Sequence, residues 1–117
     1  MTDNRIAFTT AGSLAEARKL AEAMVERRLA ACVNIVPRIQ SIYRWKGKVG
    51  ESREFLLIIK TTATAFKAVA AAIKELHSYE LPECVCVTIE DGSREYLDWI
   101  NQSVGRAETT RKKQKKI

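Results

Sequence analysis

Two stretches of the chain repeat apolar residues at the three- and four-residue spacing of an amphipathic helix. The first follows Ser13 and Glu16, which match a capping box at a helix N-terminus, and the pattern continues to Arg28. The second follows Thr62, a suitable N-cap residue, and continues to His77. The apolar positions of the two predicted helices are Leu14, Ala17, Leu20, Ala21, Met24 and Val25, and Phe66, Val69, Ala70, Ile73 and Leu76.

Four extended runs flank these helices. Residues 4–10 predict a first strand, and residues 30–45 predict a second one that Pro37 interrupts, as expected of an edge strand or a bulge. A turn at Lys46-Gly47-Lys48 leads into a third strand that contains the apolar run 55–59. The fourth strand follows Pro82, with Val85, Val87 and Ile89 facing one way and Cys84, Cys86 and Thr88 the other.

The second and third strands form a hairpin of roughly 30 residues, much longer than two ordinary strands of ~5–6 residues. Such a hairpin projects from a small body and exposes Ile42, Tyr43 and Trp45, which an oligomer would bury. After the fourth strand, Ser93 caps a short last helix. The order βαββαβ with an extra C-terminal helix predicts an α+β, ferredoxin-like fold.

The charge of the chain is concentrated at one end. The 117 residues carry a formal net charge of +6. Residues 103–117 hold six basic residues and one acidic residue, so residues 1–102 are nearly neutral. We therefore expect one domain over 1–102 and a disordered basic tail over 103–117, with no specific nucleic-acid partner because the tail lacks stacking aromatics.

Composition narrows the remaining classes of function. No apolar run is long enough to cross a membrane, and no signal peptide is recognised, so we expect a cytoplasmic protein without a membrane partner. Three cysteines, two of them two residues apart, do not form a disulfide framework. No motif pairs a nucleophile with a base, so we expect a protein that is not an enzyme.

Five short motifs, in order over residues 4–102, resemble the CutA divalent-cation-tolerance family. They are Ala31-Cys32-Val33-Asn34-Ile35, Ser41-Ile42-Tyr43-Arg44-Trp45-Lys46-Gly47-Lys48, Lys60-Thr61-Thr62, His77-Ser78-Tyr79-Glu80-Leu81-Pro82-Glu83 and Tyr96-Leu97-Asp98-Trp99. The resemblance implies a ferredoxin-like protomer and a homotrimer built like the PII signalling proteins. It also implies a role in tolerance of copper or another divalent cation, without an established enzymatic reaction.

The sequence departs from the family pattern at positions that bind copper in some members. Some bacterial members bind copper through a cysteine at the end of the first strand and two adjacent histidines. This sequence has Thr9 at the first position, and Leu76 precedes His77, so only one of those ligands is present.

Metal ligation therefore centres on His77. A neutral imidazole binds copper or zinc well, so His77, alone or with Glu80 and Cys32, is the candidate metal site. The alternative is that His77 is a hydrogen-bonded core residue and Cys32 a buried apolar one.

The tyrosines and tryptophans allow a second interpretation. They would either anchor the trimer interface, with Ile42, Tyr43 and Trp45 at its centre, or line a ligand cleft between protomers. The predicted cleft residues are Lys60, Glu54, Tyr79, Trp45 and Trp99. A PII-like sensor that binds a small anionic metabolite there, through Lys60, is the alternative to a copper-binding protein.

Overall fold

The computed structural model describes residues 2–105, and the predicted tail beyond Gly105 lies outside the described residues. The elements are β1 (Asn4–Ala11), α1 (Leu14–Glu26), β2 (Cys32–Trp45), β3 (Lys48–Thr62), α2 (Phe66–Leu76), β4 (Val85–Thr88) and α3 (Arg94–Ser103). The order matches the predicted ferredoxin-like arrangement with an extra C-terminal helix. No described helix is both long and apolar enough to span a membrane.

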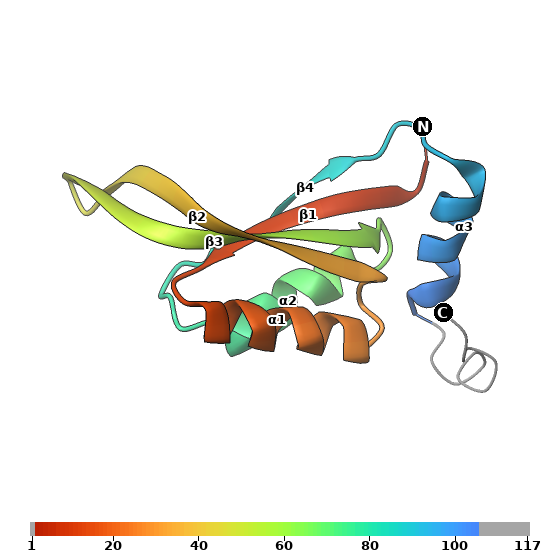
Figure 1. The fold of residues 1–117 in the computed structure, drawn as a ribbon, viewed down its shortest axis with the longest axis horizontal. Helices are drawn as coiled ribbons and strands as arrows, with labels where there is room; N and C mark the ends of the chain where they lie inside the picture. The colour runs from red at the N-terminus through yellow and green to blue at the C-terminus, as the bar shows by residue number, and fades with distance from the viewer. Residues whose placement is uncertain (1, 106–117) are drawn as a thin grey trace.

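One antiparallel sheet has the strand order β2-β3-β1-β4, and α1 and α2 cover one of its faces (Figure 1). Paired residues such as Ala7 and Ile59, or Thr9 and Leu57, lie on the helix-covered face and are fully buried. The cysteines of the last strand also pack against this core, as the alternation predicted, while Val85 and Val87 are half exposed on the opposite face. We call that opposite face the open face.

The local signals at helix ends are mostly confirmed. Ser13 accepts a hydrogen bond from the amide of Glu16, and Ser93 accepts one from the amide of Tyr96. The first helix ends at Glu26, before Arg28, because Arg28 adopts a left-handed backbone conformation with φ of 58°. Thr62 belongs to β3 and is not an N-cap, although its hydroxyl accepts from the amide of Ala65 just before α2.

The β2–β3 hairpin extends well beyond the helices, and the molecule is 49 Å long in that direction (Figure 1). Residues Lys46 and Gly47, both with positive φ, join strands that pair Trp45 with Lys48. Two positive φ values in a two-residue loop are typical of a tight hairpin turn whose twist matches that of the strands. A register shift between Val36 and Ile39 confirms the bulge predicted from Pro37.

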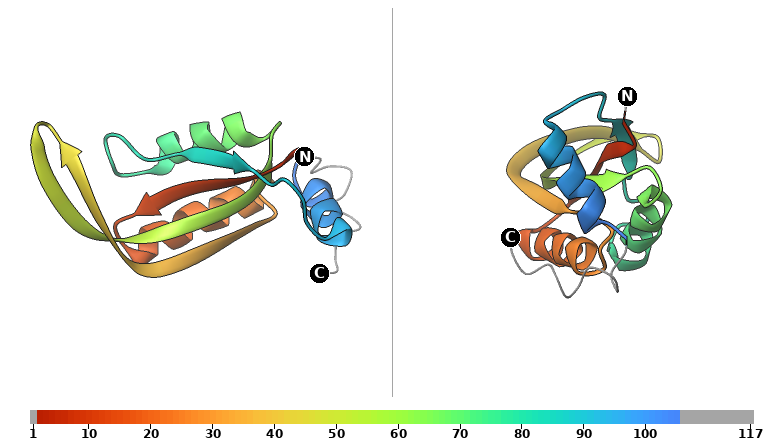
Figure 2. Two further views of the ribbon diagram at one scale, coloured as in Figure 1. Left: turned by 90° about the horizontal axis from the view of Figure 1, so that it is seen from above. Right: turned by 90° about the vertical axis from the view of Figure 1, so that its right-hand side faces the viewer.

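The last helix does not lie on either face of the sheet. It crosses the end of the sheet opposite to the hairpin tip, next to the start of β1 (Figure 2). Asn4, which is buried, donates to the side chain of Asn101, and the amide of Gly105 donates to the carbonyl of Arg28. Val104 is also buried, so the folded body extends to at least Gly105. The open face is therefore left uncovered by the helices of the same chain.

Candidate functional site

A cleft of about 780 Å³ lies between the projecting part of the β2–β3 hairpin and the loop that joins α2 to β4. The open face of the hairpin forms one wall, because Ser41, Tyr43 and Trp45 pair with the even-numbered residues of β3 that share this face. The loop residues form the other wall. The lining residues are Thr10, Ser41, Ile42, Tyr43, Arg44, Trp45, Ser52, Glu54, Tyr79, Glu80, Leu81 and Glu83.

Glu54 is the central polar residue of this cleft and is only 6% exposed. One carboxylate oxygen accepts a hydrogen bond of 2.5 Å from the Ser41 hydroxyl, and the other accepts one of 2.6 Å from the Tyr79 phenol. The ring of Tyr79 passes close to Gly12, where a Cβ atom would lie 3.2 Å from the phenolic oxygen. A glycine at the end of β1 thus leaves room for the contact between the loop and the hairpin.

Negative charge gathers in the cleft, and it changes the pKa of the ionisable side chains there. Burial, followed by the hydrogen bond and the charge of Glu54, raises the pKa of Tyr79, so the phenol remains a proton donor to Glu54. Burial, followed by the charge of Glu54, also raises the pKa of Glu83. Glu80 completes the group of three carboxylates, and Arg44 is the cationic residue among the lining residues. A cleft of this composition favours a positively charged ligand.

His77 lies behind the cleft, and its side chain is fully buried. Its Nε2 lies 2.6 Å from the carbonyl oxygen of Thr10, and its Nδ1 lies 3.1 Å from the amide nitrogen of Tyr79. The amide is a donor and the carbonyl is an acceptor, so the neutral ring with its proton on Nε2 satisfies both contacts. His77 therefore joins β1 to the loop and positions Tyr79.

Glu16 of α1 ties the same loop to the helix layer. Its carboxylate accepts hydrogen bonds from the amide of Ser78 at 2.7 Å and from the Ser78 hydroxyl at 3.1 Å, and it lies 3.4 Å from Nδ1 of His77. Burial acts to raise the pKa of Glu16, but the hydrogen bonds from the amide and hydroxyl of Ser78 outweigh it, so the pKa is lowered.

This lowered pKa predicts an acid-dependent loss of stability. A carboxylate with a depressed pKa in the folded state stabilises the fold above its ordinary pKa, and the contribution disappears as the pH falls through the lowered value. We expect Glu16→Gln to reduce the free energy of unfolding at about pH 6, and we expect this loss to shrink as the pH falls below the ordinary glutamate pKa of about 4.3. Urea titrations across this range test it, with the exposed Glu22→Gln as control. A difference that persists unchanged to the acid end would contradict the assignment.

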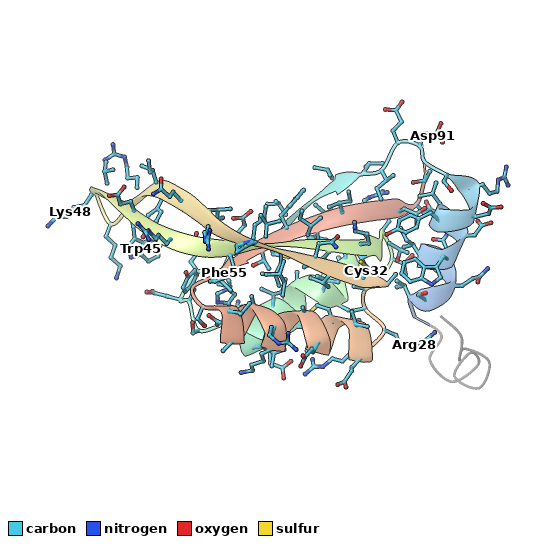
Figure 3. All side chains as sticks on the ribbon, viewed as in Figure 1. Arg28, Cys32, Trp45, Lys48, Phe55 and Asp91 are labelled. Carbon is cyan, nitrogen blue, oxygen red and sulfur yellow. The ribbon has the colours of Figure 1, made fainter. Side chains whose placement is uncertain are left out.

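The structure separates Cys32 from His77, which the sequence analysis grouped as candidate metal ligands. Cys32 pairs with Lys60 near the end of the sheet that α3 crosses, whereas Thr10, the partner of His77, pairs with Leu56. Leu56 and Lys60 are four positions apart, which corresponds to about 13 Å along a strand. Cys32 and His77 of one protomer therefore do not share a metal ion, and Figure 3 shows Cys32 and Trp45 at opposite ends of the hairpin.

Lys60 and Trp99 are likewise separated from the other predicted cleft residues. Lys60 lies on the open face, but it is six residues from Glu54, or about 20 Å along β3. Its ammonium group donates a 2.6 Å hydrogen bond to Asn34. Trp99 packs against Tyr96 of α3, with ring centroids 5.4 Å apart. Within one protomer, only Glu54, Tyr79 and Trp45 of the predicted set meet in the cleft.

The aromatic residues of the hairpin occupy a different face from its most exposed aliphatic ones. Tyr43 and Trp45 lie on the open face, and the Tyr43 phenol donates to Ser52 at 3.2 Å. Ile42 and Val49 belong to the opposite face and are 72% and 67% exposed. The predicted interface residues Ile42, Tyr43 and Trp45 thus divide between the two surfaces of the hairpin.

Other soft or polar groups offer little to a metal ion. Burial, followed by Cys86 and Glu83, raises the pKa of Cys84 to about 11, so its thiol is protonated at neutral pH. Thr9 faces the core, and its hydroxyl is buried without a hydrogen-bond partner among residues 2–105. The same described residues contain no cluster of three or more potential metal-ligating histidine, cysteine, aspartate or glutamate side chains.

Among the residues that interact with Glu54, sequence reasoning missed Ser41 and Glu83. Ser41, which binds Glu54, is an ordinary strand serine, and only the register of the hairpin reveals its partner. Glu83 ends the motif that begins at His77, but it interacts with Glu54 of β3, which is distant in the sequence. The available signal was the alternation of residues along the hairpin, once the bulge is taken into account.

Comparison with known proteins identifies the family. Residues 5–103 match the family model described as CutA1 divalent ion tolerance protein. The chain belongs to the CutA1 family. The divalent-cation tolerance protein CutA of Thermus thermophilus is 50% identical over 100 residues, which are 86% of this chain and 97% of that protein. Human protein CutA is 43% identical over 96 residues, and the matched region is 54% of its length.

Solved CutA structures have the same fold. The Thermus thermophilus protein superposes with a TM-score of 0.86 at 49% identity, covering 87% of this chain and 99% of the other. A CutA from Archaeoglobus fulgidus, described as periplasmic, superposes with a TM-score of 0.84 at 41% identity, over 87% of this chain and 99% of that one. An Arabidopsis thaliana CutA relative is named chloroplastic. Family membership therefore leaves the predicted cytoplasmic location as a prediction.

Proposed function

We propose that this CutA1 protein is a cytoplasmic homotrimer that binds divalent cations without catalysing a reaction, and that the cation is held in the Glu54 cleft. The family is named for divalent ion tolerance. The observation that carries the proposal is that Glu83 and Glu54 line the same cleft, where burial and then the charge of Glu54 raise the pKa of Glu83. A divalent cation relieves the repulsion between the two carboxylates, and its other ligands would be water or side chains of a second protomer.

The identity of the metal follows from the ligands. Oxygen ligands suit hard ions such as Mg²⁺, Ca²⁺ or Mn²⁺, while Cu²⁺ binds most sites of a given type more tightly than other divalent ions of the first transition row. Copper thus remains the expected ion for a cell under copper stress. The alternative copper site, His77 with Glu80, requires His77 to give up a backbone contact.

Calorimetric titration with Cu²⁺, Zn²⁺ and Mn²⁺ tests the proposal and separates the two sites. We expect a saturable site in the wild type that Glu83→Gln weakens by about tenfold, because a charged ligand is replaced by a neutral one of the same shape. His77→Gln is the competing variant, and Glu22→Gln is the surface control. Unchanged binding in Glu83→Gln would refute the cleft site, and loss confined to His77→Gln would place the metal on the imidazole.

The PII-like alternative, a sensor of a small anionic metabolite, has less support from the cleft. Three carboxylates and one arginine line it, so an anion would meet net repulsion. Lys60, the cation proposed for anion binding, contacts Asn34 and lies about 20 Å along the strand from Glu54. An anion site would need Lys60 of a second protomer.

A further inference from the structure

The charge of Glu54 is buried without a cationic partner. The two groups that contact it, Ser41 and Tyr79, are neutral hydroxyl donors. No lysine, arginine or histidine forms an ion pair with it in the part of the chain that the structure describes. Carboxylates are almost never buried to this extent unless a cation accompanies them. The cleft thus has a place for a positive charge beside Glu54.

A lysine of the same chain shows which kind of cation suits the outer part of the cleft. The ammonium group of Lys46 lies 5.5 Å from the centre of the Trp45 ring and 4.0 Å from a carboxylate oxygen of Glu80. This is the geometry of a cation–π contact combined with a weak ion pair. Both side chains are largely exposed, so a stronger cation can displace Lys46.

The aromatic side chains that line the cleft are not explained by the binding of a metal ion. Tyr43 and Trp45 lie on the cleft side of the hairpin, and Tyr79 faces them from the loop. Aromatic rings add little to the binding of a hydrated divalent ion. They do stabilise an organic ammonium group, and they cover its methylene chain. Primary ammonium groups also carry three N–H donors, which match carboxylate and hydroxyl oxygens.

We propose that the cleft binds a small aliphatic diamine, with one ammonium group at Glu54 and the other at Glu80, in the place that Lys46 now occupies. The methylene chain lies along the rings of Tyr43 and Trp45. This inference goes beyond divalent-cation binding and does not require a metal in the cleft.

Tryptophan fluorescence tests the inference with 1,4-diaminobutane as the probe. The titration uses the full chain carrying Trp99→Phe, so that Trp45 is the only fluorescent tryptophan. We expect a saturable change in emission with the diamine and none with 1,4-butanediol, which has the same carbon chain and no charge. Glu54→Gln is expected to weaken binding by about tenfold or more, since a charge-assisted contact is lost.

Two matched variants sharpen the result. Lys46→Gln is expected to strengthen diamine binding by about threefold, because a competing surface ion pair is removed. Glu51→Gln, on the other face of the hairpin, is expected to have no effect. A wild type that shows no saturation up to about 10 mM diamine overturns the inference, as does unchanged binding in Glu54→Gln.

The metal titration of the Glu83 variant is a separate result. If the diamine does not bind but a metal ion binds at a site that depends on Glu83, only this inference is overturned. Diamine binding without any metal site would overturn only the proposed function. Circular dichroism of Glu54→Gln establishes that the variant is folded, and its affinity for diamine is then interpretable.

Discussion

Replacement of His77 by alanine is expected to lower the free energy of unfolding by about 3 kcal/mol or more, which is a large share of the stability of a small domain. The substitution removes a fully buried ring and leaves a cavity. It also leaves the carbonyl of Thr10 and the amide of Tyr79 without the imidazole contacts that they make in the native protein. Each lost contact of a buried polar group costs about 1–3 kcal/mol.

Urea unfolding at a fixed protomer concentration measures this effect. His77→Gln is the conservative variant, because its amide can still donate to the carbonyl of Thr10, and it should fall between alanine and the wild type. Glu75→Ala, which removes only a surface ion pair with Arg27, is the matched control in the last turn of α2, two residues before His77. If His77→Ala costs no more than Glu75→Ala, the histidine does not hold the loop in place.

The second large effect is expected in the oligomeric state. Light scattering should give about three times the chain mass of 13.2 kDa for the wild type. The double variant Ile42→Glu and Val49→Glu should give the mass of a single chain. These two residues are the most exposed apolar ones of the hairpin, and buried unpaired carboxylates in an interface are costly.

The control for this test is Leu14→Glu, which places the same charge on an exposed apolar position at the start of α1. That variant should keep the mass of the wild type. A wild type with the mass of one chain would refute the trimer. A trimeric Ile42→Glu and Val49→Glu variant would show that this face of the hairpin is not the interface.

The sequence predicted the elements of the fold because their signals are local. Ser13 and Ser93 cap helices through residues three positions ahead, and the alternation of apolar residues gave the strands. The predicted end of the first helix was two residues too late, because nothing in the apolar pattern reveals the left-handed conformation of Arg28. Local signals of this kind are read from a few neighbouring residues.

The site was harder to predict because its contacts are distant in the sequence. Glu54 and Tyr79 were both chosen, but their hydrogen bond depends on how a loop folds back over the hairpin. Lys60 was chosen as the cation of the cleft that also contains Glu54, but both residues lie on β3, and the length of that strand separates them. His77 was also chosen from the sequence. The sequence does not show, however, that backbone atoms contact both nitrogens of its ring.

The bulge in β2 decides which chemistry the cleft contains. Before it, even-numbered residues such as Asn34 and Val36 lie on the open face, and after it the odd-numbered Ser41, Tyr43 and Trp45 do. Shifting a strand by one residue exchanges its two faces. If the intact strand instead continued its regular alternation without the bulge, Ile42 and Arg44 would face the cleft and the aromatic residues would face outward. The bulge thus decides which residues of the strand form the proposed cation-binding surface and which form the proposed surface for subunit contact.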